Sequence, residues 1–473
     1  MRKRNLIWAG AILLVAAAAI FLPRRPAAAP VAGQQDPQLR PLAETYRLIR
    51  ENGYRPNDDS RLLQGAAGGM AGAADEYSAY IPPAKADSFR RRIEGRDCGV
   101  GLKLETSQGV LKVFQAVYDS PAYRAGLKAG QAIVAIEGKD TDQITLPEAE
   151  QLINEGPPGS PVTLAVAGPS GKVRTVKLQR REFKVESVVG FFRGADNRWE
   201  YLVSRQPPIA LLRIREFVRE TAEDVQVALR QVDVLDGLVL DLRDNPGGQL
   251  PSAVAVADLF LAEGPIVTLV DRSGKGRPQL ARSEGTYGGD LRMAVLVNGG
   301  TASAAEIVSG ALALNGRAVL VGSRTRGKGQ IQSVLPLPAD MGEVDLTTAE
   351  FLLGDGVYIT HRRGSDRWGL DPDVRVSVPV LERIRLRRLW SQADAPQPAA
   401  SAPITRPAGE LPHTRSATLP TTSAEPSLPA TLLAEDAQLS AAIELLTSED
   451  RYNSLLAQRA AETKPATRPS TAP

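Results

Sequence analysis

An α/β fold is predicted for the central part of the chain by the alternation of two sequence patterns. Short apolar segments typical of buried strands occur at 209–214, 238–242, 294–297 and 317–321. Helical patterns lie between them, at 221–232, 251–261 and about 303–314. Strands that alternate with helices are typical of a parallel sheet covered by helices. Further strand patterns extend this core, which we place at residues 185–384, and they lie at 266–270, 344–353 and 357–361.

Length and composition set limits on the rest of the chain. The 473 residues predict about three domains. The formal net charge of +3 is close to balanced, so nothing favours nucleic acid as a partner. A single cysteine, Cys98, excludes an internal disulfide framework. We expect neither a cofactor nor a metal site.

The amino-terminal segment is typical of an exported protein. Basic residues occupy positions 2–4, and an apolar run follows over residues 6–22. As a helix, this 17-residue run would span about 25 Å, slightly less than the ~30 Å hydrocarbon core of a bilayer. It is also longer than the apolar part of most cleaved signal peptides. We therefore expect residues 1–36 to form a membrane anchor or a signal peptide with a linker. The rest of the chain would lie in the periplasm or on the outer face of the cytoplasmic membrane.

Two different patterns precede the core. Residues 37–95 show helical periodicity, whereas residues 96–184 show short strand patterns with glycines at the turns. One of these strands opens with backbone N–H groups that can point at a single carboxylate, those of Gly99, Val100, Gly101 and Leu102. With PAYRAGLKAGQAIVAIEG at 121–138 and a helix at 146–153, the segment resembles a PDZ domain, which binds a peptide carboxyl terminus as an added strand. The alternative is a β-rich domain whose glycines only form turns.

The candidate chemistry lies in residues 298–332, NGGTASAAEIVSGALALNGRAVLVGSRTRGKGQIQ. Ser303 stands at the start of the predicted helix, where the helix dipole and free N–H groups stabilise negative charge. Lys328 stands between two glycines, which allow the backbone to approach another group closely. Together they suggest a serine nucleophile with a lysine base.

Each half of this pair also has a structural interpretation. Ser303 and Glu306 fit the S-x-x-E capping box of a helix, and Lys328 can be a solvated loop lysine. The chain has only two histidines, and one of them, His413, lies in a Pro/Ser/Thr-rich tail. A Ser-His-Asp triad therefore has one candidate base at most, His361, and a lysine base is favoured.

The same residues resemble the carboxyl-terminal processing, or tail-specific, serine proteases. The resemblance covers about residues 42–376, and its most specific segments are DLRDNPGG at 241–248, VNGGTASAAEI at 297–307 and GRAVLVGSRTRGKGQIQ at 316–332. It implies a crotonase-like α/β protease core with an inserted PDZ domain and helical flanking regions. It also implies Ser303 as the nucleophile, Lys328 as its base 25 residues later, and Gln332 as the residue that orients the lysine.

An oxyanion hole is a further implication of the resemblance. Its donors would be the backbone amides of Gly247, with Gly248 as the second choice from that motif, and Ala304. The residue types at 244–248 also fit an ordinary turn without a catalytic role, because Asn, Pro and Gly each favour turns. Some relatives carry an aspartate eleven residues after the serine, where this chain has Leu314. The sequence therefore fits the Ser-Lys-Gln arrangement.

The carboxyl-terminal part changes composition. Beyond about residue 390 the chain is rich in Pro, Ala, Ser and Thr, which cannot bury a core. We expect residues 385–473 to be a linker-like tail with one amphipathic helix over 432–448. Its candidate packing residues are Leu433, Leu439, Ile443 and Leu446. This helix would pack on the core, form a homo-oligomer or bind an adaptor.

The expected function is that of an exported serine endopeptidase. The PDZ domain would bind the free carboxyl terminus of a protein substrate, and the chain upstream would reach Ser303. Two other classes remain open. One is an inactive scaffold that only binds carboxyl termini. The other is an acyl-thioester enzyme, because crotonase-like cores also host that chemistry and a fold does not fix function.

Overall fold

The computed structural model describes residues 36–168, 170–232, 234–282, 286–354, 356–362, 364–396 and 427–463. The predicted export segment at 6–22 lies outside these residues. None of the helices within the described ranges has the length and apolar content of a bilayer-spanning segment. The chain divides into two units, Met1–Ala74 and Asp75–Pro473, and each is described by itself.

The described part of the first unit, from residue 36 onward, is helical, as its periodicity predicts. A short 3-10 helix, η1 (Pro37–Leu39), leads into α2 (Arg40–Asn52), and α3 (Asp59–Ala74) follows. Leu42, Leu48 and Ile49 of α2 are exposed.

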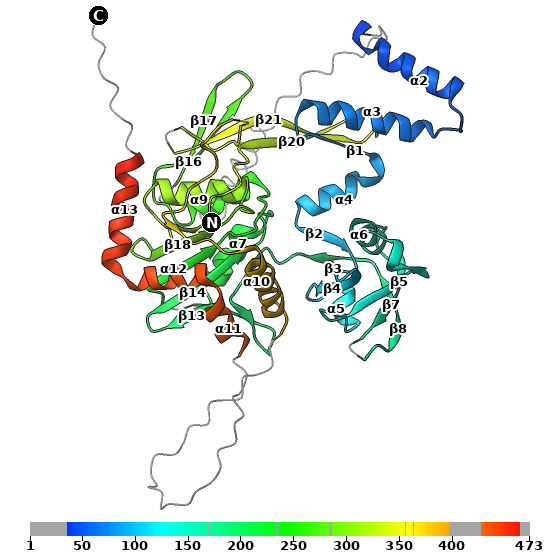
Figure 1. The fold of residues 1–473 in the computed structure, drawn as a ribbon. Helices are drawn as coiled ribbons and strands as arrows, with labels where there is room; N and C mark the ends of the chain where they lie inside the picture. Colours follow the sequence, from blue (N-terminus) through cyan, green and yellow to red (C-terminus); the bar gives the residue numbers. More distant parts are fainter. Residues whose placement is uncertain are drawn as a thin grey trace, which may run out of the picture. The chain divides into compact units, whose positions relative to one another are not determined.

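A seven-stranded sheet forms the core of the second unit (Figure 1). Its order is β10-β14-β15-β18-β19-β23, with β13 paired to β14. These strands are β10 (Val188–Val189), β13 (Leu202–Arg205), β14 (Pro208–Ile214), β15 (Gly237–Asp241), β18 (Arg292–Val297), β19 (Val319–Gly322) and β23 (Val374–Arg375). The last five of them run parallel. Helices α7 (Thr221–Leu229), α8 (Leu250–Asp258) and α9 (Ala304–Leu314) lie between them in sequence, so the predicted α/β alternation is confirmed.

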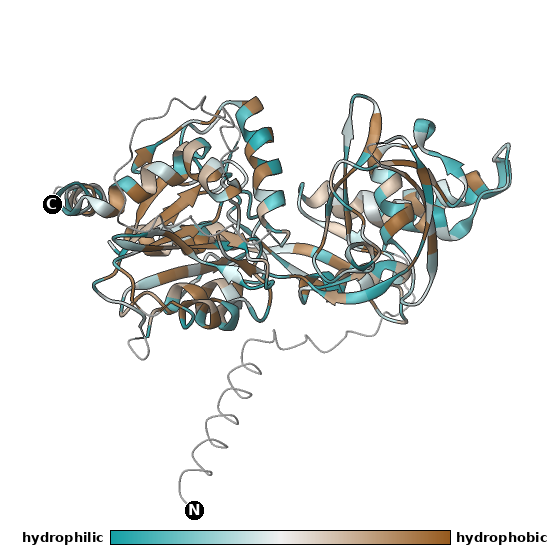
Figure 2. Ribbon diagram, turned by 90° about the horizontal axis from the view of Figure 1, so that it is seen from below, coloured by the Kyte–Doolittle hydropathy of each residue, from teal (hydrophilic) through white to brown (hydrophobic). Residues whose placement is uncertain are grey.

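Both faces of this sheet are buried, as is usual for parallel strands. Ala210 and Leu212 of β14 point into a cluster that contains residues of α7, α8 and α9. Ile209 and Leu211, the alternate residues, point into a second cluster on the other face. The brown strands of Figure 2 show the same apolar layer.

The second cluster is completed by carboxyl-terminal helices. Helix α10 (Val380–Ala393) follows the sheet, and α11 (Leu428–Glu435), α12 (Ala437–Thr447) and α13 (Glu449–Thr463) come later in the chain. Our expectation of one helix over 432–448 is therefore corrected: α11 and α12 share that range, and α13 follows it. The break occurs because Asp436 leaves the helical conformation and caps α12 through its side chain, which accepts a hydrogen bond from the Leu439 amide. Leu439 and Leu446 are buried against the sheet.

An antiparallel sheet lies elsewhere in the same unit. Its central strand is β21 (Glu343–Leu353), which pairs with β1 (Ala79–Ile81), β16 (Pro265–Asp271), β20 (Gln330–Pro336) and β22 (Val357–Tyr358). Strand β17 (Gly276–Leu280) pairs with β16, and α4 (Pro83–Ile93) follows β1. Because β20 begins two residues after Lys328, this sheet positions the lysine loop.

Residues 96–184 form a separate β-rich domain with its own core. Its sheet order is β3-β4-β5-β7-β8, with β6 paired to β5. The elements are β3 (Leu102–Ser107), β4 (Val110–Ala116), α5 (Pro121–Arg124), β5 (Ala132–Ile136), β6 (Lys139–Asp140), η2 (Thr141–Gln143), α6 (Leu146–Asn154), β7 (Pro161–Ala167) and β8 (Val173–Gln179). The pair β2 (Arg96–Gly99) and β9 (Arg181–Lys184) closes the domain. A short hairpin, β11 (Phe192–Arg193) and β12 (Trp199–Glu200), follows it.

Candidate active site

Ser303 lies on a sharp turn between β18 and α9, at the carboxyl end of a parallel strand. Its backbone angles are φ 55° and ψ −119°. An ordinary helix N-cap has an extended backbone. A non-glycine residue in this region costs about 1–3 kcal/mol, and such residues cluster at functional sites. A strained serine on a strand-to-helix turn is typical of nucleophilic serines, so its conformation favours chemistry over simple capping.

Glu306 connects the serine turn with the lysine loop. One carboxylate oxygen, Oε2, accepts hydrogen bonds from the amides of Ser303 and Lys328, both at 2.9 Å. The other, Oε1, accepts from the Gly327 amide at 2.7 Å and from the Thr325 hydroxyl. The side chain is fully buried, and this burial raises its pKa against the four hydrogen bonds. Glu306 therefore fixes the backbones of both candidate residues to one carboxylate.

Lys328 is half-buried beside an aromatic ring and two carboxylates. Its Nζ lies 4.8 Å from the centroid of the Tyr77 ring. Burial lowers the pKa of Lys328, while the nearby carboxylates of Asp345 and Asp75 oppose that shift. The pKa is thus displaced in the direction that a general base needs.

The structure does not join the three sequence-predicted catalytic side chains by hydrogen bonds. Gln332 donates through Nε2 to the Thr347 hydroxyl at 3.1 Å. Among the described side chains, Lys328 Nζ has no hydrogen bond to Ser303 Oγ or to Gln332. His361, the other candidate base, is exposed and packs edge-on against Trp368.

The candidate oxyanion turn lies against Ser303. A Cβ added to Gly247 would meet Ser303 Cβ at 2.8 Å and Ala304 N at 3.0 Å, so only glycine fits there. The Gly247 amide, however, donates to Asn245 Oδ1 at 2.8 Å. In this arrangement the amides of Gly248 and Ala304 are therefore the better candidates for a substrate oxygen.

The candidate carboxylate loop opens β3 in the β-rich domain. The carbonyl oxygens of Val100 and Gly101 accept hydrogen bonds from the Ala122 and Val117 amides. Gly101 has φ +71° and packs against Ser120. At the end of α6, Asn154 lies 3.1 Å from where a Gly99 Cβ would be, and its Nδ2 donates to the Leu102 carbonyl at 3.3 Å. The loop is thus held by its carbonyls.

Three residues of this site have no functional assignment from sequence reasoning. The S-A-A-E spacing predicts Glu306 only as a capping partner of Ser303. Asp345 and Tyr77 carry no local signal, because they reach Lys328 only through the pairing of β21 with β1 and β20. Within the described part of the chain, no group of three or more His, Cys, Asp or Glu side chains is placed to hold a metal ion.

Comparison with known families gives two matches. Residues 208–376 match the model of peptidase family S41, and residues 113–180 match the model of the PDZ domain. The first range contains Ser303, Lys328 and the 241–248 turn. The second contains most of the β-rich domain.

Two known proteins similar to this chain are named carboxy-terminal processing proteases. A carboxy-terminal-processing protease of Bartonella bacilliformis is 33% identical over 355 residues, which cover 74% of this chain and 77% of that protein. The carboxy-terminal processing protease CtpA of Bacillus subtilis is 30% identical over 352 residues, covering 74% and 71%. A solved structure, the photosystem II D1 C-terminal processing protease, is 24% identical with a TM-score of 0.43, covering 76% of this chain and 99% of that one.

Proposed function

This chain belongs to the carboxy-terminal-processing proteases of peptidase family S41, and on that premise we propose that it cleaves proteins with Ser303 and Lys328 after binding their free carboxyl termini. The family makes it a serine-type peptidase with a PDZ domain on a crotonase-like α/β core. The identity of the dyad and the recognition of the carboxyl terminus are our proposals.

The observation that best supports the dyad is the shared carboxylate of Glu306. It accepts hydrogen bonds from the amides of Ser303 and Lys328, both at 2.9 Å, and so joins the serine turn to the lysine loop. The hydrogen bond between the two side chains would form in the active arrangement, since catalytic hydrogen bonds are often long in the free enzyme. Gln332 would then contact the lysine.

The proposed reaction needs no cofactor. Neutral Lys328 takes the proton from Ser303 Oγ as the oxygen attacks the substrate carbonyl carbon. The resulting oxyanion receives hydrogen bonds from the Ala304 and Gly248 amides. Lys328 then gives the proton to the leaving amine. The same lysine next deprotonates a water molecule that attacks the acyl-serine, and it returns the proton to Ser303 Oγ as the ester bond breaks and the new carboxyl terminus leaves.

Substrate choice would depend on the loop at 99–102. Its amide groups would receive the terminal carboxylate, while the substrate backbone would pair with β3. The amides of Val117 and Ala122 fix the loop backbone through its carbonyl oxygens, which supports this proposal.

The test uses one unstructured peptide in two forms, with a free and with an amidated carboxyl terminus. We expect the purified chain to cleave the free form faster, because amidation removes the anion that the loop receives. Ser303→Ala should abolish cleavage and keep binding. Equal cleavage of both forms would reject carboxyl-terminal recognition.

The same assay separates the two rival classes. Binding without any Ser303-dependent cleavage would indicate the inactive scaffold. Acyl-thioester hydrolysis that does not need Lys328 would indicate the thioester enzyme. Export through residues 6–22, membrane anchoring, a homo-oligomer and an adaptor remain predictions.

A further inference from the structure

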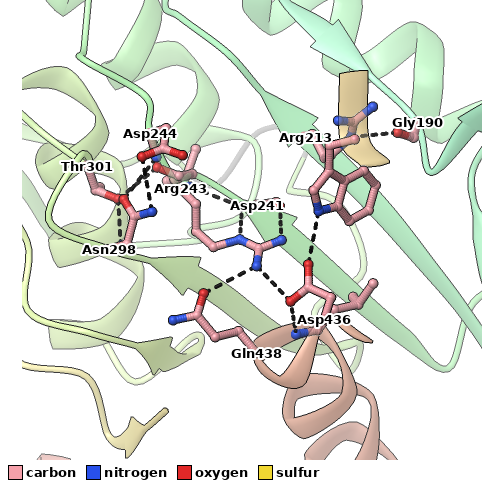
Figure 3. Close-up of polar contacts among 12 residues, drawn as sticks. Gly190, Arg213, Asp241, Arg243, Asp244, Asn298, Thr301, Asp436 and Gln438 are labelled. Carbon is pink, nitrogen blue, oxygen red and sulfur yellow. Dashed lines mark hydrogen bonds and ion pairs between the residues drawn. The ribbon is translucent and has the colours of Figure 1, made fainter. Parts of the chain in front are cut away.

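Arg243 is a buried cation at the carboxyl end of β15, directly before the candidate oxyanion turn. Its guanidinium donates two hydrogen bonds to Asp241, through Nε at 2.9 Å and through Nη2 at 2.6 Å (Figure 3). Its third nitrogen, Nη1, donates to Asp436 Oδ1 at 2.8 Å and to Gln438 Oε1 at 3.2 Å. Two of its four acceptors therefore come from a segment almost 200 residues later, as the sequence separations of 193 and 195 show.

Both carboxylate oxygens of Asp436 accept hydrogen bonds. It is fully buried between α11 and α12. Besides Arg243, its Oδ1 accepts the Leu439 amide at 3.0 Å, and its Oδ2 accepts the Trp390 indole N–H at 3.0 Å. Gln438 is fixed at its other end, where Nε2 donates to the Val376 carbonyl at 2.9 Å.

Arg243 and Asp436 each influence the pKa of the other. Burial alone would lower the pKa of Arg243, but the carboxylates of Asp241 and Asp436 outweigh it and raise that pKa. Burial alone would raise the pKa of Asp436, but the charge of Arg243 holds it below its usual range. Removal of one partner from such a pair leaves an uncompensated buried charge, which the structure around it must rearrange to accommodate.

The turn that follows Arg243 is bonded to the turn that precedes Ser303. The Asp244 amide donates to Asn298 Oδ1 at 2.9 Å, and Asn298 Nδ2 donates to Asp244 Oδ1 at 3.2 Å. The Thr301 hydroxyl donates to the Leu242 carbonyl at 2.8 Å. Figure 3 shows this cluster beside the guanidinium of Arg243. A shift of Arg243 would therefore be transmitted to both turns.

We propose that Asp436 and Gln438 are positioning residues for the peptidase centre, which they reach through Arg243 from beyond the region that matches the S41 family model. The matched region ends at residue 376, so Asp436 and Gln438 lie outside it. Asp436 fixes Arg243, Arg243 fixes the 244–248 turn, and that turn holds Gly247 against Ser303 and carries the candidate Gly248 amide. The effect on catalysis rests on the proposed function, whereas the effect on the turn does not.

The test is Asp436→Asn, which keeps the shape of the side chain and removes its charge. Whichever way the new amide turns, its NH₂ group faces a donor, either the Trp390 indole or the Arg243 and Leu439 N–H groups. We expect kcat to fall between about 10- and 100-fold with KM little changed, because a small displacement of a catalytic donor has effects of this size. Hydrogen exchange of the 241–250 peptide should become faster in the same variant.

Tyr452→Phe is the matched control. The Tyr452 hydroxyl also joins the carboxyl-terminal helices to the sheet, through the Met293 amide at 3.0 Å, but at the opposite end of β18 from Ser303. This variant should lose stability while kcat and exchange at 241–250 stay unchanged. If kcat and exchange at 241–250 changed alike in both variants, Asp436 would have only a structural role.

Two readouts separate failure of this inference from failure of the proposed function. If the unmodified chain cleaves peptides and Asp436→Asn leaves kcat unchanged, the inference is wrong and the proposed function stands. If no Ser303-dependent cleavage occurs, the proposed function is wrong, and hydrogen exchange alone then tests the inference about Asp436. Unchanged exchange at 241–250 in Asp436→Asn then overturns the inference, and faster exchange supports it.

Discussion

At the scale of single residues, the chemistry depends on how much of Lys328 is neutral near pH 7. An ordinary lysine, with a pKa of about 10.4, is neutral in only about one molecule in a thousand at pH 7.4. Burial lowers the pKa of Lys328, and the charge of Arg326 adds to that effect. The carboxylates of Asp345, Asp75 and Glu306 act in the opposite direction. The site therefore sets the basicity of the lysine by a balance between burial and nearby acids.

This balance predicts the direction in which a charge change moves the pH profile. We expect kcat/KM to rise with pH through one base ionisation, at a lower pH than the pKa of an ordinary lysine. Asp345 stabilises the charged lysine, so Asp345→Asn should lower the pKa of Lys328 further and move the rising limb to lower pH. The measurement is kcat/KM against pH for both enzymes.

Two further variants control this measurement. Asp340→Asn removes an exposed carboxylate from the same β20–β21 connection and should leave the limb in place. Lys328→Ala should abolish turnover and keep peptide binding. A limb that moved to higher pH in Asp345→Asn would contradict the assignment of Lys328 as the base, and His361 would be the next residue to test.

At the scale of elements, the site depends on the attachment of α9 to the lysine loop through Glu306. In Glu306→Gln, one carboxylate oxygen becomes an NH₂ group that faces N–H or O–H donors. Each buried donor left without an acceptor costs about 1–3 kcal/mol. We expect a large loss of kcat together with a measurable loss in the free energy of unfolding, assayed by turnover and by chemical denaturation.

A neighbouring buried residue distinguishes this effect from general damage to α9. Ser309 is also buried in α9, where its hydroxyl donates to the Ala305 carbonyl one turn earlier. Ser309→Ala should keep kcat close to that of the unmodified chain. If Glu306→Gln kept kcat as well, the shared carboxylate would not hold the two candidate residues in a catalytic arrangement.

The same elements show what a sequence can and cannot predict here. The strand–helix alternation and the end of α9 at Asn315 and Gly316 follow from local patterns, and the structure has them. The positions of Tyr77 and Asp345 beside Lys328 could not be predicted, because they depend on pairing between strands more than 250 residues apart, such as Ala79 with Asp345. The local pattern predicts that Glu306 caps the helix at Ser303, but it gives no sign of the hydrogen bonds that Glu306 accepts from the lysine loop.

At the scale of the whole described unit, the carboxyl-terminal helices belong to the protease core. Helix α12 packs on β15, β18 and β19, and its apolar residues share a cluster with those strands. Composition predicted a tail because the Pro/Ala/Ser/Thr-rich residues dominate this region, and only the apolar spacing within 432–448 pointed to packing. A sheet with two apolar faces needs cover on both. That requirement is a property of the complete fold, which no local pattern in the tail expresses.

The last prediction follows from this cover. Leu445 of α12 is fully buried against the sheet, so Leu445→Ala should lower the free energy of unfolding by about 2–5 kcal/mol through lost contacts and a cavity. Leu381→Ala makes the same chemical change on α10 at a side chain that is 80% exposed, and its effect should be close to zero. Chemical denaturation of both variants, followed by tryptophan fluorescence and by circular dichroism, gives the comparison. Because α12 completes the core, both probes should report one shared transition for the sheet and these helices. A separate early loss of helix signal, or an equally small effect of both substitutions, would mean that α11, α12 and α13 are an independent appendage, and Asp436 could not then hold Arg243 throughout turnover.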